Sequence, residues 1–122
     1  MSSPSRATGI RRRAEFASIF AQGRSLAGEA IVLYWRVRPE GPPRAGFCVG
    51  KQLGKAVTRN RIKRLLRESW RSLAPAVAVP ADLVFIARRG GLDFSLIEWR
   101  RAMRDLLRRA GLLTEGNDEG GK

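Results

Sequence analysis

The alternation of apolar and polar residues predicts three strands in this chain. Over 29–38 (EAIVLYWRVR) the alternation is regular and separates two faces of a strand. One face holds Ile31, Leu33, Trp35 and Val37, and the other holds Val32, Tyr34 and Arg36. A turn (EGPPR) leads to a shorter strand over 45–50 (AGFCVG), with Cys48 opposite its apolar residues. The segment 81–89 (ADLVFIARR) is a nearly continuous apolar strand.

Helical periodicity predicts three helices around these strands. The first spans 11–23, places Phe16, Ile19 and Phe20 on one face, and ends at Gly23. The second spans 55–73, and its core-facing stripe consists of Ile62, Leu65, Leu66, Ser69, Trp70 and Leu73. The third ends at Gly111 and is carried by Leu96, Trp99, Met103, Leu106, Leu107 and Ala110. This order of elements predicts an α+β fold, a compact α/β sandwich on a small sheet.

The length of the chain and the composition of its ends predict one domain with two extensions. A chain of 122 residues, 43% of them hydrophobic, can bury one modest core. Residues 1–10 read as a flexible basic arm and 114–122 as a disordered tail, because both are polar and lack apolar periodicity. We therefore expect a single folded domain over 11–113.

The net charge of the chain indicates which kind of molecule it binds. The chain has 24 basic and 11 acidic residues, a formal net charge of +13. Such an imbalance destabilises the compact state through self-repulsion, which indicates a resident anionic partner: nucleic acid first, an anionic membrane second. Twenty of the basic residues are arginine, whose planar guanidinium suits bidentate contacts with phosphate. The longest apolar stretch is interrupted by two prolines and Asp82, so no membrane span is expected.

The residue types that catalysis and metal binding require are sparse. The chain has no histidine, and Cys48 is its only cysteine. The carboxylates are scattered, without the cluster that would hold the Mg²⁺ ions of a protein-only nuclease. These features favour a protein that binds nucleic acid and performs no catalysis on its own. A lone cysteine and an N-terminal stretch without an apolar signal segment are typical of cytoplasmic proteins, which is the localisation we expect.

The predicted helix over 55–73 combines its apolar stripe with a strongly basic face. One i, i+4 row on that face consists of Arg59, Lys63 and Arg67. Beside it lie Asn60, Arg64 and Arg71, with Arg61 further round. Only Glu68 relieves the repulsion among these like charges. Two interpretations remain open: a solvated surface helix, or a helix that holds a polyanion, and the second is favoured by Lys51 and Lys55 just upstream.

The segment KAVTRNRIKRLLRE (55–68) resembles the basic signature helix of the bacterial ribonuclease P protein component family. Other segments resemble the same family in the same order. EFASIFAQGRSL is similar to its first helix, VLYW to its tyrosine-bearing strand, GFCVGKQLGKAV to the strand and lysine before the signature, and ADLVFIAR to its last strand. The similarity covers about residues 10–113. An isolated RNRxKR motif would be a weak signal, whereas this ordered set is specific.

The resemblance implies a fold and a function. The fold is a four-stranded sheet with three helices and a left-handed βαβ crossover (ribosomal S5 domain 2-like). The function is that of an RNA-binding domain over 11–113 that partners a catalytic RNA, the two together removing the 5′ leader from precursor tRNA. The RNA and its bound Mg²⁺ would perform the hydrolysis, with no catalytic residue in the protein. The residues expected to bind the catalytic RNA are Arg59, Asn60, Arg61, Lys63, Arg64 and Arg67.

Aromatic residues indicate a second surface. Phe16 and Phe20 are i, i+4 on the first predicted helix, and Tyr34 faces away from the main apolar side of its strand. Such rings stack on bases of single-stranded RNA with about 1–3 kcal/mol per base. From the pattern alone, core positions are the simpler explanation of the two phenylalanines. The resemblance favours a leader-binding cleft that also includes Lys51, and in it Cys48 stands where many relatives carry a small hydroxyl residue.

Two other functions fit parts of the pattern. A nucleic-acid packaging protein, such as a small ribosomal protein, would explain the charge and size but not the ordered similarity to one family. A protein-only nuclease would need the missing carboxylate cluster. Neither DNA nor a membrane is expected as a partner. For Arg11, Arg12 and Arg13 two interpretations are equally favoured, contact with the RNA or a flexible basic arm. The arginines of the last helix are expected to be mostly solvated, with at most a general attraction to RNA: Arg100, Arg101, Arg104, Arg108 and Arg109.

Overall fold

The computed structural model of the protein describes residues 13–114. The predicted basic arm over 1–10 and the predicted tail beyond residue 114 lie outside the described residues. The helices are α2 (Arg13–Gln22), α3 (Ala56–Leu73) and α4 (Leu96–Arg109). The strands are β1 (Arg24–Ala27), β2 (Ile31–Val37), β3 (Arg44–Cys48) and β4 (Ala81–Ala87). Short 3₁₀ turns lie at η1 (Lys51–Leu53), η2 (Ala74–Ala76) and η3 (Arg89–Gly91).

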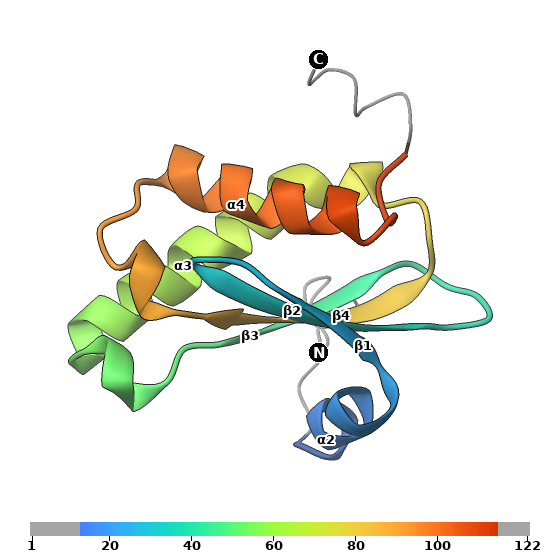
Figure 1. Ribbon diagram of the computed structural model, residues 1–122, viewed down its shortest axis with the longest axis horizontal. Coiled ribbons are helices and arrows are strands. Elements are labelled where there is room, and N and C mark those ends of the chain that lie inside the picture. The colour runs from blue at the N-terminus through green and yellow to red at the C-terminus, as the bar shows by residue number, and fades with distance from the viewer. Residues whose placement is uncertain (1–12, 115–122) are drawn as a thin grey trace, which may run out of the picture.

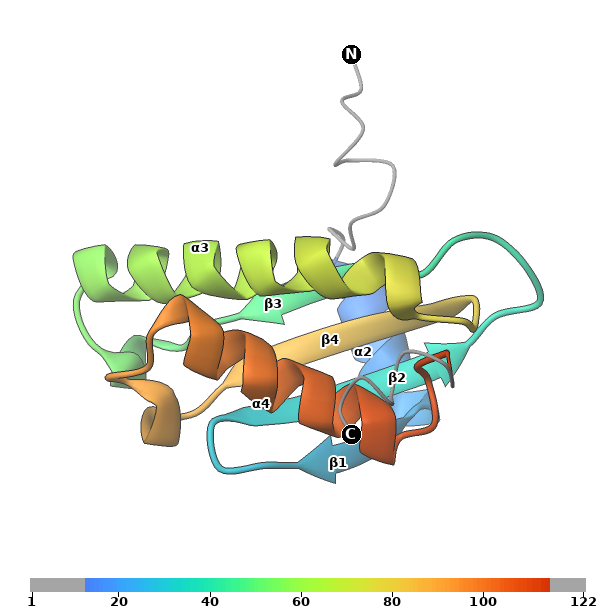
Figure 2. The same ribbon diagram turned by 90° about the horizontal axis from the view of Figure 1, so that it is seen from above.

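The four strands form one mixed sheet in the order β1-β2-β4-β3. β2 is antiparallel to β1 and to β4, whereas β3 and β4 are parallel, with Phe47 opposite Phe85. α3 connects the parallel pair across one face of the sheet, and Figures 1 and 2 show that this connection is left-handed. Nearly all such crossovers in proteins are right-handed. The four-stranded sheet and the unusual crossover confirm what the resemblance implied.

β1 is the element that the hydrophobic pattern did not predict. It has four residues, and only the side chain of Leu26 is partly buried. β1 forms because it pairs with β2, from Arg24 opposite Trp35 to Ala27 opposite Val32. A strand that is stabilised by backbone pairing at the edge of a sheet leaves little alternation in the sequence.

The main core lies between the sheet and the layer formed by α3 and α4 (Figure 1). The predicted stripe of α3 is buried there, with Ile62 and Leu66 inaccessible to solvent. The ring of Phe85 from β4 lies between those of Phe47 and Trp70, with centroid distances of 5.9 and 5.8 Å. The buried face of β2 matches the prediction except at Val37, which is 58% exposed because the strand ends there.

α2 lies alone on the opposite face of the sheet (Figure 1). A second, much smaller apolar cluster forms beneath it, in which only Ile19 and Val84 are fully buried. The surrounding residues are half-buried, among them Phe16 of α2 and Tyr34 of β2. The two faces of the sheet therefore differ: one carries the core, and the other carries a single short helix beside partly open aromatic residues.

Candidate nucleic-acid interface

The basic face of α3 carries most of the residues expected to contact RNA. Five of the six predicted contact residues point into solvent: Asn60, Arg61, Lys63, Arg64 and Arg67. Among residues 13–114, none of their charged groups lies within 4.0 Å of a carboxylate. The helix also begins without a side-chain cap at Lys55, so the free N–H groups of its first turn add positive potential. This face attracts anions and has no internal counter-charge.

Arg59 is the exception among the six. Its side chain is half-buried, and its Nε donates a hydrogen bond to the backbone carbonyl of Gly54 at 3.0 Å. Gly54 adopts a φ of +130°, a conformation that favours glycine, and so turns the chain from η1 into α3. Arg59 therefore helps to hold the turn at the start of α3, in addition to any contact with a ligand.

The basic face of α3 adjoins the open face of the sheet at the end of β3. Burial raises the pKa of the Cys48 thiol, and the nearby positive charge of Lys63 opposes that rise. α3 runs along the edge strand β3 (Figure 2), and Cys48 at the end of that strand contributes its side chain to the small cluster beneath α2. The structure thus brings the predicted RNA-binding helix next to the predicted cleft.

Phe16, Phe20 and Tyr34 lie together beside that cluster. The ring centroids of Phe16 and Phe20 are 6.3 Å apart, and those of Phe20 and Tyr34 are 4.9 Å apart with an edge-to-face arrangement. Phe20 is 41% exposed, and the other two are half-buried. The rings are therefore neither fully buried nor isolated, and the aromatic set presents one continuous, partly exposed wall.

The fourth residue of the predicted cleft comes from a different element. Lys51 is exposed in η1, three residues beyond the end of β3. Arg89 fixes the position of η1, because its guanidinium donates to the carbonyl oxygen of Gln52 at 2.9 Å. Lys51 thus stands on an anchored turn between the cleft side of the sheet and the start of α3.

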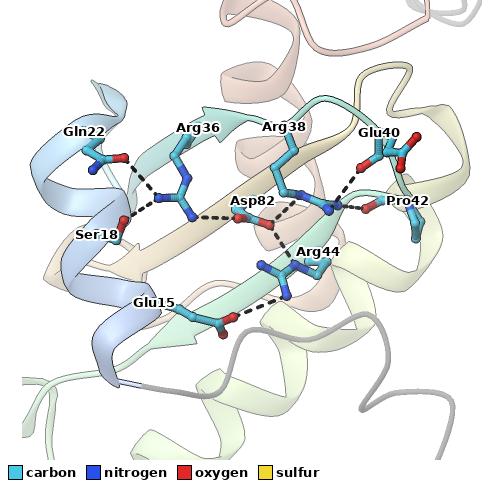
Figure 3. Close-up of polar contacts among 9 residues, drawn as sticks. All are labelled: Glu15, Ser18, Gln22, Arg36, Arg38, Glu40, Pro42, Arg44 and Asp82. Atoms are coloured by element: carbon cyan, nitrogen blue, oxygen red, sulfur yellow. Dashed lines mark hydrogen bonds and ion pairs between the residues drawn. The ribbon is translucent and has the colours of Figure 1, made fainter.

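A cluster of three arginines around Asp82 was not found from the sequence. Asp82 at the start of β4 has no exposed side-chain surface, and its carboxylate contacts an arginine of β2 and one of β3, Arg36 Nη2 at 3.0 Å and Arg44 Nε at 2.8 Å. Arg38 Nε, just beyond β2, lies 3.0 Å from the same carboxylate (Figure 3). A charge inside an otherwise apolar strand has to be paired. This rule predicts from the sequence that Asp82 has a charged partner, but it does not identify which residues pair with it.

The protonation of Asp82 follows from its partners. Burial by itself would raise the pKa of this carboxyl, but the hydrogen bonds from Arg44 and Arg36 and the charges of Arg44 and Arg38 outweigh it and hold the pKa below the ordinary value. Hydrogen bonding to Asp82 likewise raises the pKa of Arg44, against the effect of its burial. The cluster is therefore ionised throughout, with its arginines about one quarter exposed.

Other arginines are also engaged within the protein. Arg88 donates to the carbonyl of Gly28 at 2.9 Å, and on α4 both Arg108 and Arg109 contact Asp105, at 3.2 and 3.3 Å. The remaining arginines of α4 have no carboxylate partner within the described residues: Arg100, Arg101 and Arg104. Arg13 is exposed, while Arg11 and Arg12 lie outside the described residues.

Across residues 13–114 the structure offers no group of three or more histidine, cysteine or acidic residues that could hold a metal ion. The one fully buried carboxylate among them, that of Asp82, is surrounded by arginines, which excludes a cation from it. In the same part of the chain, no helix has the length and apolar character needed to cross a membrane. The described residues thus provide cationic and aromatic contacts, but no metal centre.

Comparison with known proteins assigns this arrangement to a family. The family model described as Ribonuclease P matches residues 5–111. The ribonuclease P protein component of Symbiobacterium thermophilum is 46% identical over 105 residues, which cover 85% of this chain and 91% of that protein. The solved structure of the Staphylococcus aureus RNase P protein has a TM-score of 0.80 at 30% identity, covering 88% of this chain and 99% of that one.

The Thermotoga maritima RNase P protein is similarly close, with a TM-score of 0.76 at 31% identity over 82% of this chain and 94% of that one. The range of the family model includes every helix and strand described above, from α2 to α4. The chain therefore belongs to the ribonuclease P protein component family, whose members serve the 5′ processing of tRNA.

Proposed function

We propose that this protein binds the catalytic RNA of ribonuclease P through the basic face of α3. The observation that carries the proposal is the set of exposed cationic side chains that have no carboxylate partner among the described residues: Arg61, Lys63, Arg64 and Arg67. Binding RNA phosphates would relieve their mutual repulsion and release counterions. Asn60 lies on the same face and adds hydrogen-bonding capacity, and Arg59 contributes the edges of its guanidinium that do not face Gly54.

The single-stranded 5′ leader of precursor tRNA would bind on the open face of the sheet. The partly exposed rings of Phe16, Phe20 and Tyr34 offer surfaces on which bases stack, a mode that does not depend on sequence. Lys51, on its anchored turn, is available for a phosphate of the same strand. Because α3 runs along β3 at the edge of the sheet (Figure 2), the leader and the catalytic RNA would be bound side by side.

In this proposal the protein contributes binding and orientation. Bound Mg²⁺, held by the RNA, would supply the activated water and stabilise the leaving oxygen. The protein's cations lower the repulsion between the leader and the catalytic RNA, so that fewer ions are needed to bring them together. The described residues contain neither a metal-binding cluster nor a histidine, which supports assigning the hydrolysis to the RNA partner.

Reconstitution tests this function directly. The purified protein is incubated with precursor tRNA alone, with the cognate catalytic RNA alone as reference, and then with both. We expect no cleavage by the protein alone, and cleavage at the mature 5′ end by the reconstituted complex at a Mg²⁺ concentration too low for the RNA by itself. Mg²⁺-dependent cleavage by RNA-free protein would contradict the proposal. Co-purification with assembled ribosomes, rather than with one RNA, would favour the packaging alternative.

The aromatic wall has its own test. Phe16→Ala and Phe20→Ala should weaken the affinity of the holoenzyme for precursor tRNA by about five- to tenfold, as expected when one base no longer stacks on a ring. Affinity for mature tRNA, which lacks the leader, should stay the same. An equal loss for both substrates, or a loss explained by unfolding, would show that the rings serve the core only.

A further inference from the structure

α2 has too little apolar contact to fix its own position. The helix has ten residues, and Ile19 is its only fully buried side chain. A helix of this length is not stable alone in water, so its placement must come from contacts with the sheet. Its C-terminal end is fixed at Gly23, where the backbone approaches β2 so closely that a Cβ would lie 2.5 Å from the carbonyl oxygen of Trp35. Fixing one end still leaves the helix free to rotate about its axis.

Two rows of side chains flank Ile19 on opposite sides of α2. On one side lie Phe16 and Phe20, roughly 60° and 100° around the helix from Ile19. On the other side, roughly 40° to 100° away, lies a polar row. The polar row consists of Glu15, Ser18 and Gln22. Any rotation that moves the polar row toward the sheet moves the aromatic row away from it, and the reverse.

The polar row is bound to two arginines of the sheet. Arg44 Nη1 lies 3.4 Å from Glu15 Oε2 at the first part of the helix. Arg36 Nη1 donates to Gln22 Oε1 at 3.3 Å and also to the hydroxyl of Ser18 (Figure 3). The helix is therefore held on this side near both of its ends, at positions seven residues apart.

Both arginines are in turn oriented by one carboxylate. Asp82 Oδ2 accepts from Arg36 and Oδ1 from Arg44, and these two bonds direct the remaining N–H groups of each guanidinium at α2. The third arginine faces away from α2, because Arg38 donates to the carbonyls of Glu40 and Pro42 in the turn before β3. Figure 3 shows Asp82 at the centre, with α2 on one side and that turn on the other.

We propose that Asp82 is a positioning residue for substrate recognition: through Arg36 and Arg44 it sets the rotation of α2, and so the presentation of Phe16 and Phe20 to the leader. This inference rests on the leader-binding role proposed above. Asp82 itself is fully buried and touches no substrate. Its effect on recognition would pass only through the helix that the two arginines hold.

The test compares two aspartates that each contact arginines. Asp82→Asn removes the charge that orients Arg36 and Arg44 with little change in shape. Asp105→Asn is the matched control, since Asp105 also contacts two arginines, but on the exposed surface of α4 with no link to α2. A second variant, Glu15→Ala with Ser18→Ala and Gln22→Ala, removes the α2 side of the network, leaves the Asp82 cluster in place and substitutes a good helix former. Phe20→Ala is the reference for loss of stacking.

Each variant is assembled with the catalytic RNA at a temperature where circular dichroism shows it folded, and its affinities for precursor and mature tRNA are measured. We expect Asp82→Asn and the triple variant to lower the precursor affinity by about fivefold or more, comparable to Phe20→Ala. Affinity for mature tRNA and for the catalytic RNA should change by less than about twofold, a shift that is within the effect of one weak contact. Asp105→Asn should leave all three affinities unchanged.

The outcomes separate this inference from the function on which it rests. If Phe20→Ala lowers the precursor affinity while Asp82→Asn and the triple variant do not, the leader-binding role of the aromatic wall stands and the positioning role is overturned. If Phe20→Ala has no selective effect, the leader-binding role is wrong and the inference falls with it. If Asp82→Asn weakens both substrates equally and the triple variant weakens neither, Asp82 serves stability alone, which also overturns the inference.

Discussion

The basic face of α3 and the arginine cluster around Asp82 use the same side chain in opposite ways. On α3, Arg61, Arg64 and Arg67 project into solvent with no carboxylate nearby among the described residues. In the cluster, three arginines converge on one buried carboxylate, and their N–H groups bind carbonyl and side-chain oxygens of the protein. The number of arginines in a sequence therefore does not measure its capacity for RNA. What matters is how many of them lack an internal partner.

This contrast divides the protein's positive charge into two parts with different dependence on salt. Charges that release counterions when RNA binds make the affinity fall as salt rises. Charges that are already paired within the fold contribute mainly to its stability, and they are screened less because they are partly buried. The division can be tested by removing charge from each region in turn and measuring both properties.

The largest effect, on affinity for the catalytic RNA, is expected from substitutions on α3. In the variant with Arg61, Lys63, Arg64 and Arg67 all changed to Gln, the affinity for the catalytic RNA should fall by orders of magnitude. The slope of log K against log salt should become shallower by roughly 0.7 to 0.9 for each phosphate that the protein no longer neutralises. Folding should be unchanged or slightly improved, since like charges no longer repel each other and Gln suits a helix. Arg59 is left in place because it also holds the turn at Gly54.

The matched control for α3 lies on α4. Arg100, Arg101 and Arg104 lack carboxylate partners in the described part of the chain but do not belong to the signature helix. Changing these three to Gln should reduce RNA affinity far less than the α3 variant does. Equal losses from the two helices would mean that general charge, and not the α3 face, determines binding.

A smaller effect, on the stability of the fold and not on its affinity for the catalytic RNA, is expected at the cluster. Asp82→Ala leaves three arginines without their common counter-charge and should destabilise the fold by about 3 kcal/mol, the lower end of the range for a broken buried ion pair. Asp105→Ala on the surface of α4 should cost less than about 1 kcal/mol, because exposed pairs contribute little. Chemical unfolding of the free protein measures both. Similar losses would show that burial does not distinguish the two aspartates.

The smallest effect concerns the dependence of stability on pH. The pKa of Asp82 in the folded protein lies below its ordinary value of 3.8, so the stability it confers is fully present above that value. As the pH falls below 3.8 toward the folded pKa, this contribution is lost, because the unfolded state binds the proton more readily. Below about pH 4, the free energy of unfolding should therefore decline less steeply in Asp82→Asn than in the unmodified protein. If the free energy of unfolding declined equally steeply in both proteins, the loss of stability in acid would come from other carboxylates.

The sequence predicted burial correctly where the pattern of apolar residues within a single helix or strand was sufficient to indicate it. The apolar stripe of α3 identified its buried side chains, and the alternation over β2 identified Tyr34 and Arg36 as facing away from the main core. The six predicted contact residues followed from the family resemblance, and the structure leaves five of them exposed. The partial burial of Arg59 was not predicted, since it depends on the turn at Gly54.

What the sequence did not reveal depends on pairs of distant residues. Asp82 lies 46 positions from Arg36 and 38 from Arg44, and no periodic pattern connects them. The β2–β4 register places Arg36 opposite Asp82, and the parallel β3–β4 register does the same for Arg44. Only the strand order of the completed sheet creates this cluster. β1 was missed for a related reason, because its partner and not its own pattern makes it a strand.

The position of β4 has a consequence for the order in which the protein matures. β4 is the last strand along the described chain, yet it lies between β2 and β3, so neither of those strands can complete its pairing before β4 arrives. Strands that pair over such long separations form late, whereas a helix forms from neighbours in sequence. During synthesis, α3 can therefore emerge and become helical before two residues that α2 needs have been added to the chain. These are Val84, on which α2 packs, and Asp82, which binds the arginines that hold α2. The surface proposed to bind the catalytic RNA can form first, and the surface proposed to bind the leader can form only when the sheet closes.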